Sequence, residues 1–394
     1  MVYINRKLDQ TLKSHVTKGD SILLLGPRQT GKTTLLSHVK PDQHMTLMMN
    51  QVRQRYEKNI GLFRAEITQI KETLGKSPLV IVDEIQKVPE LLDDIQVMID
   101  EKQAQFILTG SSARKLRKRS HDINLLPGRL TMLRLDPLTQ EEFPVKDLNL
   151  NLLYGNLPAV SLEANAAAKE VYLESYVQTY LEEEVRAEAL SRNIGAFARF
   201  LEHAALDSGK IVSFRNISNE IGVSHVTVSA YYEILEDCLI AERIDPLTTS
   251  SSRKKLTKAS RYLFFDMGVR RLAADEGIKL NRERLGDLFE HFIGLELVRL
   301  SRLQTQKFRL RFWRDPGGPE VDWVIDRQHD YIPIEVKWSE TPGKQDARHL
   351  NTFLDEYKDR CQKAYVICRT PRAYKIDQRI TALPWQDLPS LVRF

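Results

Sequence analysis

The sequence contains few cysteines and no long apolar run. Only Cys238, Cys361 and Cys368 are present among 394 residues, and no two of them form a C-x-x-C pair. This excludes a disulfide framework and offers no ligand set for a structural zinc ion, so reduced thiols are expected. No apolar stretch reaches the roughly 18 residues of a membrane span, and the opening MVYINRKLDQ lacks the apolar core of a signal peptide. We therefore expect a cytoplasmic protein without a membrane partner.

The charged residues are nearly balanced in number but unevenly placed. Lys and Arg total 58 against 53 Asp and Glu, a formal net charge of +5, and 42% of the residues are apolar. This length and composition predict two or three globular domains. Lys and Arg gather in three runs: Arg114, Lys115, Arg117, Lys118 and Arg119; Arg253, Lys254, Lys255, Lys258 and Arg261; and Arg299, Arg302, Lys307, Arg309, Arg311 and Arg314. Each run is typical of either a polyanion contact or a solvated face, and three of them together favour the first.

A glycine-rich motif follows the first predicted strand. Residues 21–25, SILLL, indicate a buried parallel strand, and the next residues fit G-x-x-x-x-G-K-[ST] at Gly26, Gly31, Lys32 and Thr33. In such a loop the backbone N–H groups surround phosphate oxygens, the lysine reaches the β- and γ-phosphates, and the threonine hydroxyl binds Mg²⁺. The following helix adds the partial charge of its N-terminus. The predicted ATP contacts are Gly26, Pro27, Arg28, Gln29, Thr30, Gly31, Lys32, Thr33 and Thr34.

Two acidic residues follow the second predicted strand, residues 79–82. Asp83, beside the phosphate loop, can hold the water shell of Mg²⁺, and Glu84 can polarise the water that attacks the γ-phosphate. The alternative is an acidic pair at the start of a helix, and the upstream loop makes that alternative weaker.

Three further residues are candidates for completing this site. Thr109 and Ser111 follow a third predicted strand, 105–108, and their hydroxyls could sense the γ-phosphate, although such residues also form turns. Arg129 precedes another predicted strand and could reach the nucleotide of an adjacent subunit as an arginine finger, or could be an ordinary surface arginine.

The segments GPRQTGKTTLL, VIVDEIQKVPELL, FILTGSSARKL and LPGRLTMLRLDPLTQEEF resemble a prokaryotic AAA-type ATPase family whose C-terminal region has no assigned function. The resemblance implies a parallel α/β sheet in residues 1–140 and a homo-oligomer such as a hexameric ring. It also implies Thr109 or Ser111 as sensor and Arg129 as the finger acting in trans. No second sensor arginine is apparent in the segment that would form the lid.

The middle of the chain is predicted to be helical and then to form a winged helix. Residues 141–205 show helical periodicity and suggest a lid or connector, and residues 206–262 suggest a winged helix-turn-helix. One helix ends at Gly222, and the next begins after Ser224. The second helix would present His225, Thr227 and Ser229 to a DNA groove, with backbone binding favoured over sequence readout. The alternative is a protein-contact module.

Residues 263–394 are predicted to form an α/β domain with the order helix, three strands, helix, strand. The first helix, 284–300, carries Glu290, the middle strand carries Asp322, and the next strand carries Glu335 and Lys337 on one face. Asp322 and Glu335 would share Mg²⁺, Glu290 would join through a metal-bound water, and Lys337 would activate water. The D…E-x-K pattern resembles the restriction-endonuclease-like superfamily, which includes junction resolvases. An ion pair between Lys337 and either acid is the alternative.

The leading hypothesis is an ATP-driven protein that binds DNA through the winged helix and cuts it, with branched DNA favoured by the resemblance to resolvases. The alternative is a nucleotide-gated regulator or defence ATPase whose nuclease-like domain is inactive and only binds DNA or protein.

Overall fold

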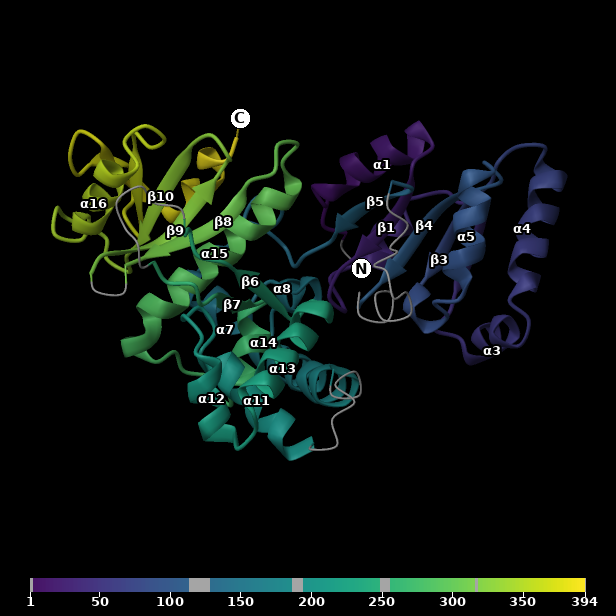
Figure 1. The fold of residues 1–394 in the computed structure, drawn as a ribbon, viewed down its shortest axis with the longest axis horizontal. Coiled ribbons are helices and arrows are strands. Elements are labelled where there is room, and N and C mark those ends of the chain that lie inside the picture. The colour runs from purple at the N-terminus through teal and green to yellow at the C-terminus, as the bar shows by residue number, and fades with distance from the viewer. Residues whose placement is uncertain (1–2, 113–127, 186–193, 249–255, 316–317, 394) are drawn as a thin grey trace. The chain divides into compact units, whose positions relative to one another are not determined.

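The computed structural model describes residues 3–112, 128–185, 194–248, 256–315 and 318–393. These residues form two compact units (Figure 1). Unit 1 consists of Met1–Leu138 with the short segment Asp237–Ile240, and unit 2 of Thr139–Glu236 with Ala241–Phe394. The basic residues at 114–119 and 253–255 lie outside the described residues, so their contacts with a polyanion stay predictions. No helix in the described ranges is long and apolar enough to cross a membrane.

Unit 1 is built on a sheet of five strands in the order β2-β3-β4-β1-β5. The strands are β1 (Ser21–Leu25), β2 (Gln43–Thr46), β3 (Leu79–Asp83), β4 (Gln105–Gly110) and β5 (Leu130–Arg134). Every neighbouring pair is parallel, so all five carboxyl ends lie at one edge of the sheet. β1 is buried along its whole length, as expected for an apolar strand inside a parallel sheet. The predicted parallel α/β sheet is confirmed.

Helices in unit 1 cover the sheet and hold the strand order in place. They are α1 (Leu8–Lys18), α2 (Lys32–Leu36), α3 (Asn50–Lys58), α4 (Gly61–Leu74), the 3₁₀ turn η1 (Ile85–Lys87) and α5 (Leu91–Asp100). α4 and α5 lie side by side (Figure 1). Phe63 and Ile67 of α4 and Ile95 of α5 pack in one apolar core with Val80 and Phe106 of the strands.

Unit 2 begins with helices. They are α7 (Leu148–Tyr154), α8 (Pro158–Leu162), α9 (Ala166–Tyr176), the π-helical segment η2 (Val177–Val185), α11 (Ile194–Leu206), α12 (Phe214–Ile221) and α13 (His225–Asp237). α12 ends at Gly222, whose φ of 73° favours glycine, and the Ser224 hydroxyl accepts the Thr227 N–H at 3.1 Å to start α13. Two helices joined by a tight turn thus lie where the sequence predicts the helix-turn-helix. An antiparallel pair, β6 (Ala241–Ile244) and β7 (Arg261–Phe264), and α14 (Met267–Ala273) follow.

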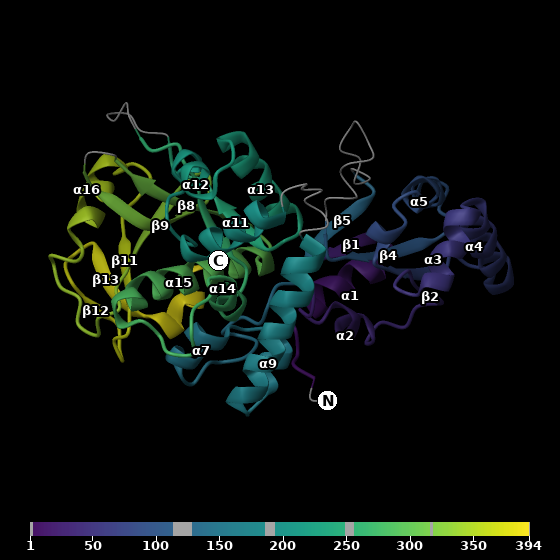
Figure 2. The same ribbon diagram turned by 90° about the horizontal axis from the view of Figure 1, so that it is seen from below.

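A six-stranded mixed sheet forms the C-terminal part of unit 2, in the order β12-β13-β11-β10-β9-β8 (Figure 2). Its elements are η3 (Arg282–Arg284), α15 (Leu285–Leu303), β8 (Arg309–Arg314), β9 (Glu320–Asp326), β10 (Tyr331–Val336), α16 (Arg348–Glu356), β11 (Ala364–Cys368), β12 (Tyr374–Lys375), β13 (Ile380–Pro384) and η4 (Trp385–Leu391). β8, β9 and β10 are antiparallel, whereas β10, β11 and β13 are parallel. The helix, three strands, helix and strand appear in the predicted order.

The two helices of this part pack on different apolar clusters. Ile334 and Val336 of β10 belong to the cluster with α15, whereas Val324 and Val366 belong to the cluster with α16. The Asp346 carboxylate accepts the Gly343 N–H at 2.8 Å and closes a turn there, and α16 begins after this turn, at Arg348. Successive side chains of a strand point to opposite faces of the sheet. Glu335, which lies between Ile334 and Val336, therefore points away from the cluster with α15.

Buried ion pairs form both between and within the helices of unit 2. Arg271 of α14 binds both carboxylate oxygens of Glu170 on α9 at 2.7 Å. Arg299 on α15 binds Glu296 one turn earlier at 3.0 Å, and both side chains are almost fully buried. The sequence-based grouping of Arg299 with a polyanion-binding run is therefore wrong, because a glutamate on the same helix supplies its counter-charge inside the protein.

Candidate functional site

The phosphate loop connects the carboxyl end of β1 to the start of α2. Gly31 has φ of 95°, and a Cβ on Gly26 would lie 2.3 Å from the Leu135 carbonyl oxygen, so both positions require glycine. The Thr30 hydroxyl donates to the Pro27 carbonyl oxygen at 2.9 Å and holds the loop in shape. The residues between β1 and α2 thus form the turn that the sequence motif predicts.

Lys32 lies inside this loop. Its Nζ donates to the carbonyl oxygens of Gly26 and Pro27 at 2.7 and 3.0 Å, and the residue is only 7% exposed. Burial lowers the pKa of Lys32 to about 8, while the carboxylates of Glu84 and Asp83 act in the opposite direction. The lysine is therefore a desolvated cation whose only hydrogen bonds among the described residues go to neutral carbonyls. A polyphosphate placed in the loop would supply the missing negative charge.

Asp83 and Thr109 lie at the carboxyl ends of the neighbouring strands β3 and β4. The Thr109 hydroxyl donates to the Asp83 carboxylate and accepts the Glu84 N–H at 3.0 Å. Asp83, Glu84 and Thr109 of the predicted site therefore lie together at the carboxyl edge of the sheet. A buried hydroxyl fixes the carboxylate that is expected to lie next to Mg²⁺.

Glu84 is held by two side chains. Its backbone is left-handed, with φ of 59°, and its carboxylate accepts hydrogen bonds from the Ser111 hydroxyl at 3.1 Å and from the Gln86 amide. Ser111 is a predicted residue, whereas sequence reasoning missed Gln86. The only sequence signal for Gln86 is its position two residues after Glu84, in the turn η1.

Sequence reasoning also missed two arginines at this edge. Arg6, just before α1, donates to the carbonyl oxygens of Thr30 and Asp136 at 2.7 and 2.6 Å. Arg134 lies at the carboxyl end of β5, opposite Leu25 in the parallel register, and its Nε is 3.0 Å from the Asp136 carboxylate. Neither belongs to a recognisable motif, so only the fold identifies them.

Arg129 lies at the other edge of the sheet. It precedes β5, whose first residue Leu130 pairs with Ser21 at the amino end of β1. Its Nε contacts the Asp100 carboxylate at 2.6 Å, and this hydrogen bond raises the pKa of Arg129 and lowers that of Asp100. The structure does not bring Arg129 to the phosphate loop of its own chain. Its assignment as a finger in trans stays a prediction.

A second charged centre lies in unit 2 and gathers Glu290 of α15, Asp322 of β9 and Glu335 of β10. Burial, and then the charge of Asp322, raises the pKa of Glu290 to about 8 and raises that of Glu335 well above its usual value. Burial also raises the pKa of Asp322. Asp322 accepts the Val336 N–H at 2.8 Å, which aligns it with β10. The predicted acids therefore share one desolvated region.

Two cations neutralise these acids. Lys337 Nζ is 2.7 Å from one Glu335 oxygen, and the pKa of Lys337 is raised because the carboxylates of Glu335 and Asp322 outweigh the effect of burial. Arg261 of β7 pairs with Glu290 and lies over the Phe312 ring, 4.7 Å from its centroid. The sequence placed Arg261 in a phosphate-gripping run. That prediction is wrong for this residue, because it is buried against an acid and an aromatic ring.

The carboxylates meet a metal ion's requirements only in part. Glu335 Oε2 is buried and has no hydrogen-bond partner among the described residues, and carboxylate oxygens suit Mg²⁺. Within the described ranges, however, no three His, Cys, Asp or Glu side chains are arranged to hold an ion. Asp322 and Glu335 are the pair that fits, and Glu290 is engaged by Arg261.

Two of the predicted DNA-reading residues, His225 and Thr227, lie on the first turn of α13, and Ser229 follows on the next turn. His225 is exposed, and Val226, which was not predicted, is 65% exposed. The Thr227 hydroxyl is 2.9 Å from the Ser224 hydroxyl, so it takes part in capping the helix. The surface of this turn is mostly uncharged.

Three family models match successive parts of the chain. An AAA domain matches residues 18–144, a domain of unknown function (DUF8612) matches 145–280, and another domain of unknown function (DUF4143) matches 285–388. The phosphate loop and the acids after β3 lie within the first match. The N-terminal part of the chain is therefore an AAA-type P-loop ATPase module. The acid centre around Asp322 lies within the third match.

Two curated relatives and several solved structures resemble the chain. The uncharacterized proteins Mb2031c of Mycobacterium bovis and Rv2008c of Mycobacterium tuberculosis are each 24% identical over 349 residues, which is 87% of this chain and 76% of theirs. AMPPCP-bound DnaA from Aquifex aeolicus shares 14% identity over 60% of this chain and 89% of its own, with a TM-score of 0.28. A STAND protein with a tetratricopeptide repeat sensor, PH0952 from Pyrococcus horikoshii, shares 13% identity over 77% and 47%, with a TM-score of 0.29. At these TM-scores the structural likeness adds nothing to the assignment, which rests on the AAA match and the loop.

Proposed function

We propose that this protein hydrolyses Mg-ATP in unit 1 and uses the reaction to control an action on DNA in unit 2. The observation that carries the proposal is the buried Lys32, held in a glycine-rich loop beside Asp83 and Glu84 at the next strand ends. A buried cation without an anionic hydrogen-bond partner among the described residues favours a polyanionic ligand.

Each residue has a role in the proposed hydrolysis. Lys32 neutralises the β- and γ-phosphates, and Thr33 and Asp83 provide the oxygen ligands for a metal. Mg²⁺, when bound, offsets the charge that develops on the phosphates. Glu84 positions and deprotonates the attacking water after leaving Ser111 and Gln86, and Thr109 links Asp83 to the Glu84 backbone. The hydrogen bonds from Ser111 and Gln86 therefore hold Glu84 in a resting position, in which it does not yet act as the base.

Assembly is part of the proposal. Arg129 precedes the amino end of β5, whereas the phosphate loop of the same chain follows the carboxyl end of β1. Arg129 is therefore assigned to the nucleotide of a neighbouring subunit in a homo-oligomer. Its present partner, Asp100, is an exposed carboxylate on a helix end, and such a pair is weak enough to be exchanged for a phosphate.

The DNA half of the proposal uses the helix-turn-helix and the acid centre. α12 and α13 would contact the DNA backbone, and Asp322 and Glu335 would bind Mg²⁺ next to a scissile phosphate of branched DNA. Bound there, the metal would activate water and stabilise the leaving oxygen. Lys337 would stabilise the cleaved phosphate. The buried, unpartnered oxygen of Glu335 among the described residues supports this use.

One observation favours a second candidate. Arg261 and Lys337 already supply two positive charges to three acids, which is the arrangement expected of a purely structural ion-pair cluster. In that case the protein is a nucleotide-gated regulator or defence ATPase whose C-terminal domain binds DNA or protein without cutting it.

A cleavage panel tests the proposal. Linear, single-stranded and four-way DNA are incubated with and without ATP, and with Mg²⁺, Mn²⁺ or EDTA. We expect Glu335→Ala and the shape-conserving Glu335→Gln to abolish metal-dependent cleavage and to leave ATP turnover unchanged. Glu283→Gln, at an exposed position just before α15, is the matched control.

The outcomes separate the two candidates. DNA binding without cleavage of any form by the wild type would reject the nuclease and support the regulator. Full ATP affinity in Lys32→Ala would show that the phosphate loop has been misassigned.

A further inference from the structure

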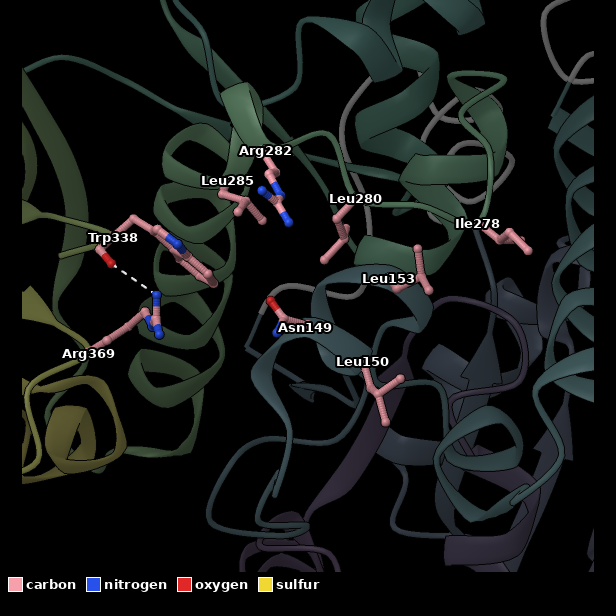
Figure 3. A pocket seen from close by; sticks show the side chains of 9 residues that line it. All are labelled: Asn149, Leu150, Leu153, Ile278, Leu280, Arg282, Leu285, Trp338 and Arg369. Carbon is pink, nitrogen blue, oxygen red and sulfur yellow. Dashed lines mark hydrogen bonds between the residues drawn. The ribbon is translucent and has the colours of Figure 1, made fainter. Parts of the chain in front are cut away.

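A cavity of about 430 Å³ opens in unit 2, between α7, the segment before α15, and the ends of β10 and β11 (Figure 3). This volume lies within the roughly 300–1,000 Å³ of sites for small ligands. It is lined by leucines and Ile278, with Trp338, Asn149, Arg282 and Arg369 as its aromatic and polar residues. No carboxylate lines it in the part of the chain that the structure describes.

Trp338 is a prearranged aromatic platform in this cavity. The Phe289 ring meets it edge-on, with centroids 5.5 Å apart and an interplanar angle of 79°. The Arg369 guanidinium lies over the indole, 4.4 Å from its centroid, and donates to the Trp338 carbonyl oxygen at 3.4 Å (Figure 3). A stacked guanidinium and indole together offer a flat, polarisable surface for a planar ring.

The charge of the cavity is positive. Arg282 points toward the cavity and makes no ion pair with any described residue (Figure 3). Arg369 pairs at 2.9 Å with Glu340, which is 62% exposed, and such a pair is readily exchanged for another anion. The Asn149 amide adds a donor and an acceptor. An aromatic ligand that carries a negative charge satisfies all of these groups.

The cavity lies at the carboxyl edge of the same strand that carries the acid centre. Lys337 and Trp338 are consecutive, and the Lys337 N–H is bonded to the Ile367 carbonyl oxygen at 2.9 Å, which ties this edge to β11. The carboxyl edge of parallel strands is where such sheets commonly bind ligands. A strand of nucleic acid that crosses this edge would meet Glu335 and Lys337 on one side and Trp338 on the other.

We propose that the cavity binds an unpaired nucleotide of a DNA strand, with its base against Trp338 and Arg369 and its phosphate near Arg282. The inference deepens the proposed function, on which it rests, by assigning a preference for DNA with unpaired bases.

Tryptophan fluorescence gives a direct readout. Trp313 and Trp323 are fully buried and Trp385 is 5% exposed, whereas Trp338 is partly exposed in the cavity. These are all four tryptophans of the chain, so quenching by added DNA reports on Trp338. The probes are a short unstructured single strand and the same strand with abasic sugars, which keeps every phosphate but removes the bases. EDTA is present and ATP is absent, so neither cleavage nor hydrolysis contributes.

We expect the base-bearing strand to quench the fluorescence and to bind more tightly than the abasic strand. Measured by the fluorescence anisotropy of a dye-labelled strand, which does not depend on Trp338, Trp338→Leu should weaken the base-bearing strand about tenfold and leave the abasic strand unaffected, and Trp338→Phe should restore most of the loss. Arg282→Gln should weaken both strands, whereas Arg372→Gln, at an exposed position outside the cavity, should change neither. Unchanged far-ultraviolet circular dichroism and an unchanged urea unfolding midpoint would show that the variants are folded.

Equal binding of both strands without quenching would overturn the cavity assignment and leave the DNA-binding proposal standing. Absence of binding to either strand would overturn the inference, and the cleavage panel with ATP, metal and four-way DNA would decide the proposed function separately. Quenching by an amphipathic acidic peptide but not by DNA would assign the cavity to a protein partner and also overturn the inference.

Discussion

The two charged centres bury opposite charges and satisfy them differently. In unit 1 burial lowers the pKa of one cation, Lys32, whose hydrogen bonds go to neutral carbonyls. In unit 2 burial raises the pKa of three acids, but Arg261 and Lys337 lie against two of them. Lys32 therefore has carboxylates nearby but no anionic hydrogen-bond partner among the described residues, and a ligand can supply one, whereas two of the three acids in unit 2 are already paired. A metal ion that binds in unit 2 must therefore displace Arg261 or Lys337, or bind beside them.

The largest expected effect tests the first centre. Glu84→Gln should lower ATP turnover by about 10²–10⁴-fold, because an amide cannot take the proton of the attacking water. ATP affinity should change little, since Lys32 and the loop are untouched. Steady-state turnover and equilibrium binding of a fluorescent ATP analogue measure the two quantities separately.

Glu72→Gln, an exposed position on α4, is the control and should behave as the wild type. Turnover of Glu84→Gln near that of the control would remove Glu84 from the reaction and weaken the contrast between the centres.

The second prediction tests whether Arg261 neutralises the charge of Glu290 in unit 2. Arg261→Met keeps much of the packing on Phe312 but leaves Glu290 without its cation, so the free energy of unfolding should fall by about 3–5 kcal/mol. Adding Glu290→Gln should recover part of this loss. Urea unfolding followed by tryptophan fluorescence reports on unit 2, because all four tryptophans belong to it.

Arg379→Met removes a more exposed pair with Asp355 and should cost less than about 1 kcal/mol. If Arg261→Met costs no more than this control, the acids of unit 2 are not compensated by Arg261, and the two centres are more alike than their geometry indicates.

The smallest effect uses pH to probe the buried cation. Without ATP, Lys32 loses its proton as the pH rises through about 8, whereas a bound triphosphate keeps it protonated. ATP binding above that pH must therefore take up a proton, and the dissociation constant should rise by up to about tenfold per pH unit, with little change below.

Calorimetric titrations in buffers of different ionisation enthalpy measure the proton uptake. Lys32→Arg, whose side chain stays charged, should bind ATP without this pH dependence. Proton uptake that is equal in the two proteins would mean that Lys32 is already charged in the empty site.

The difference between the centres also explains what sequence reasoning could find. Lys32 and its loop are contiguous, and Asp83 and Glu84 directly follow a strand, so both carry a local signal. Gln86 reaches the same site through a turn and is marked only by its position two residues after Glu84, and Arg6 reaches it from a segment before α1 that carries no motif. Arg261 was misread as a surface residue because its partner, Glu290, is 29 residues away.

The sequence by itself determined the phosphate loop, the parallel strands and the order of elements in the C-terminal part, because these depend on apolar periodicity and on backbone requirements of neighbouring residues. Only the tertiary structure decided which charges are neutralised inside the protein. Charge compensation depends on distance and burial, and both are set by segments that meet only after the chain has folded.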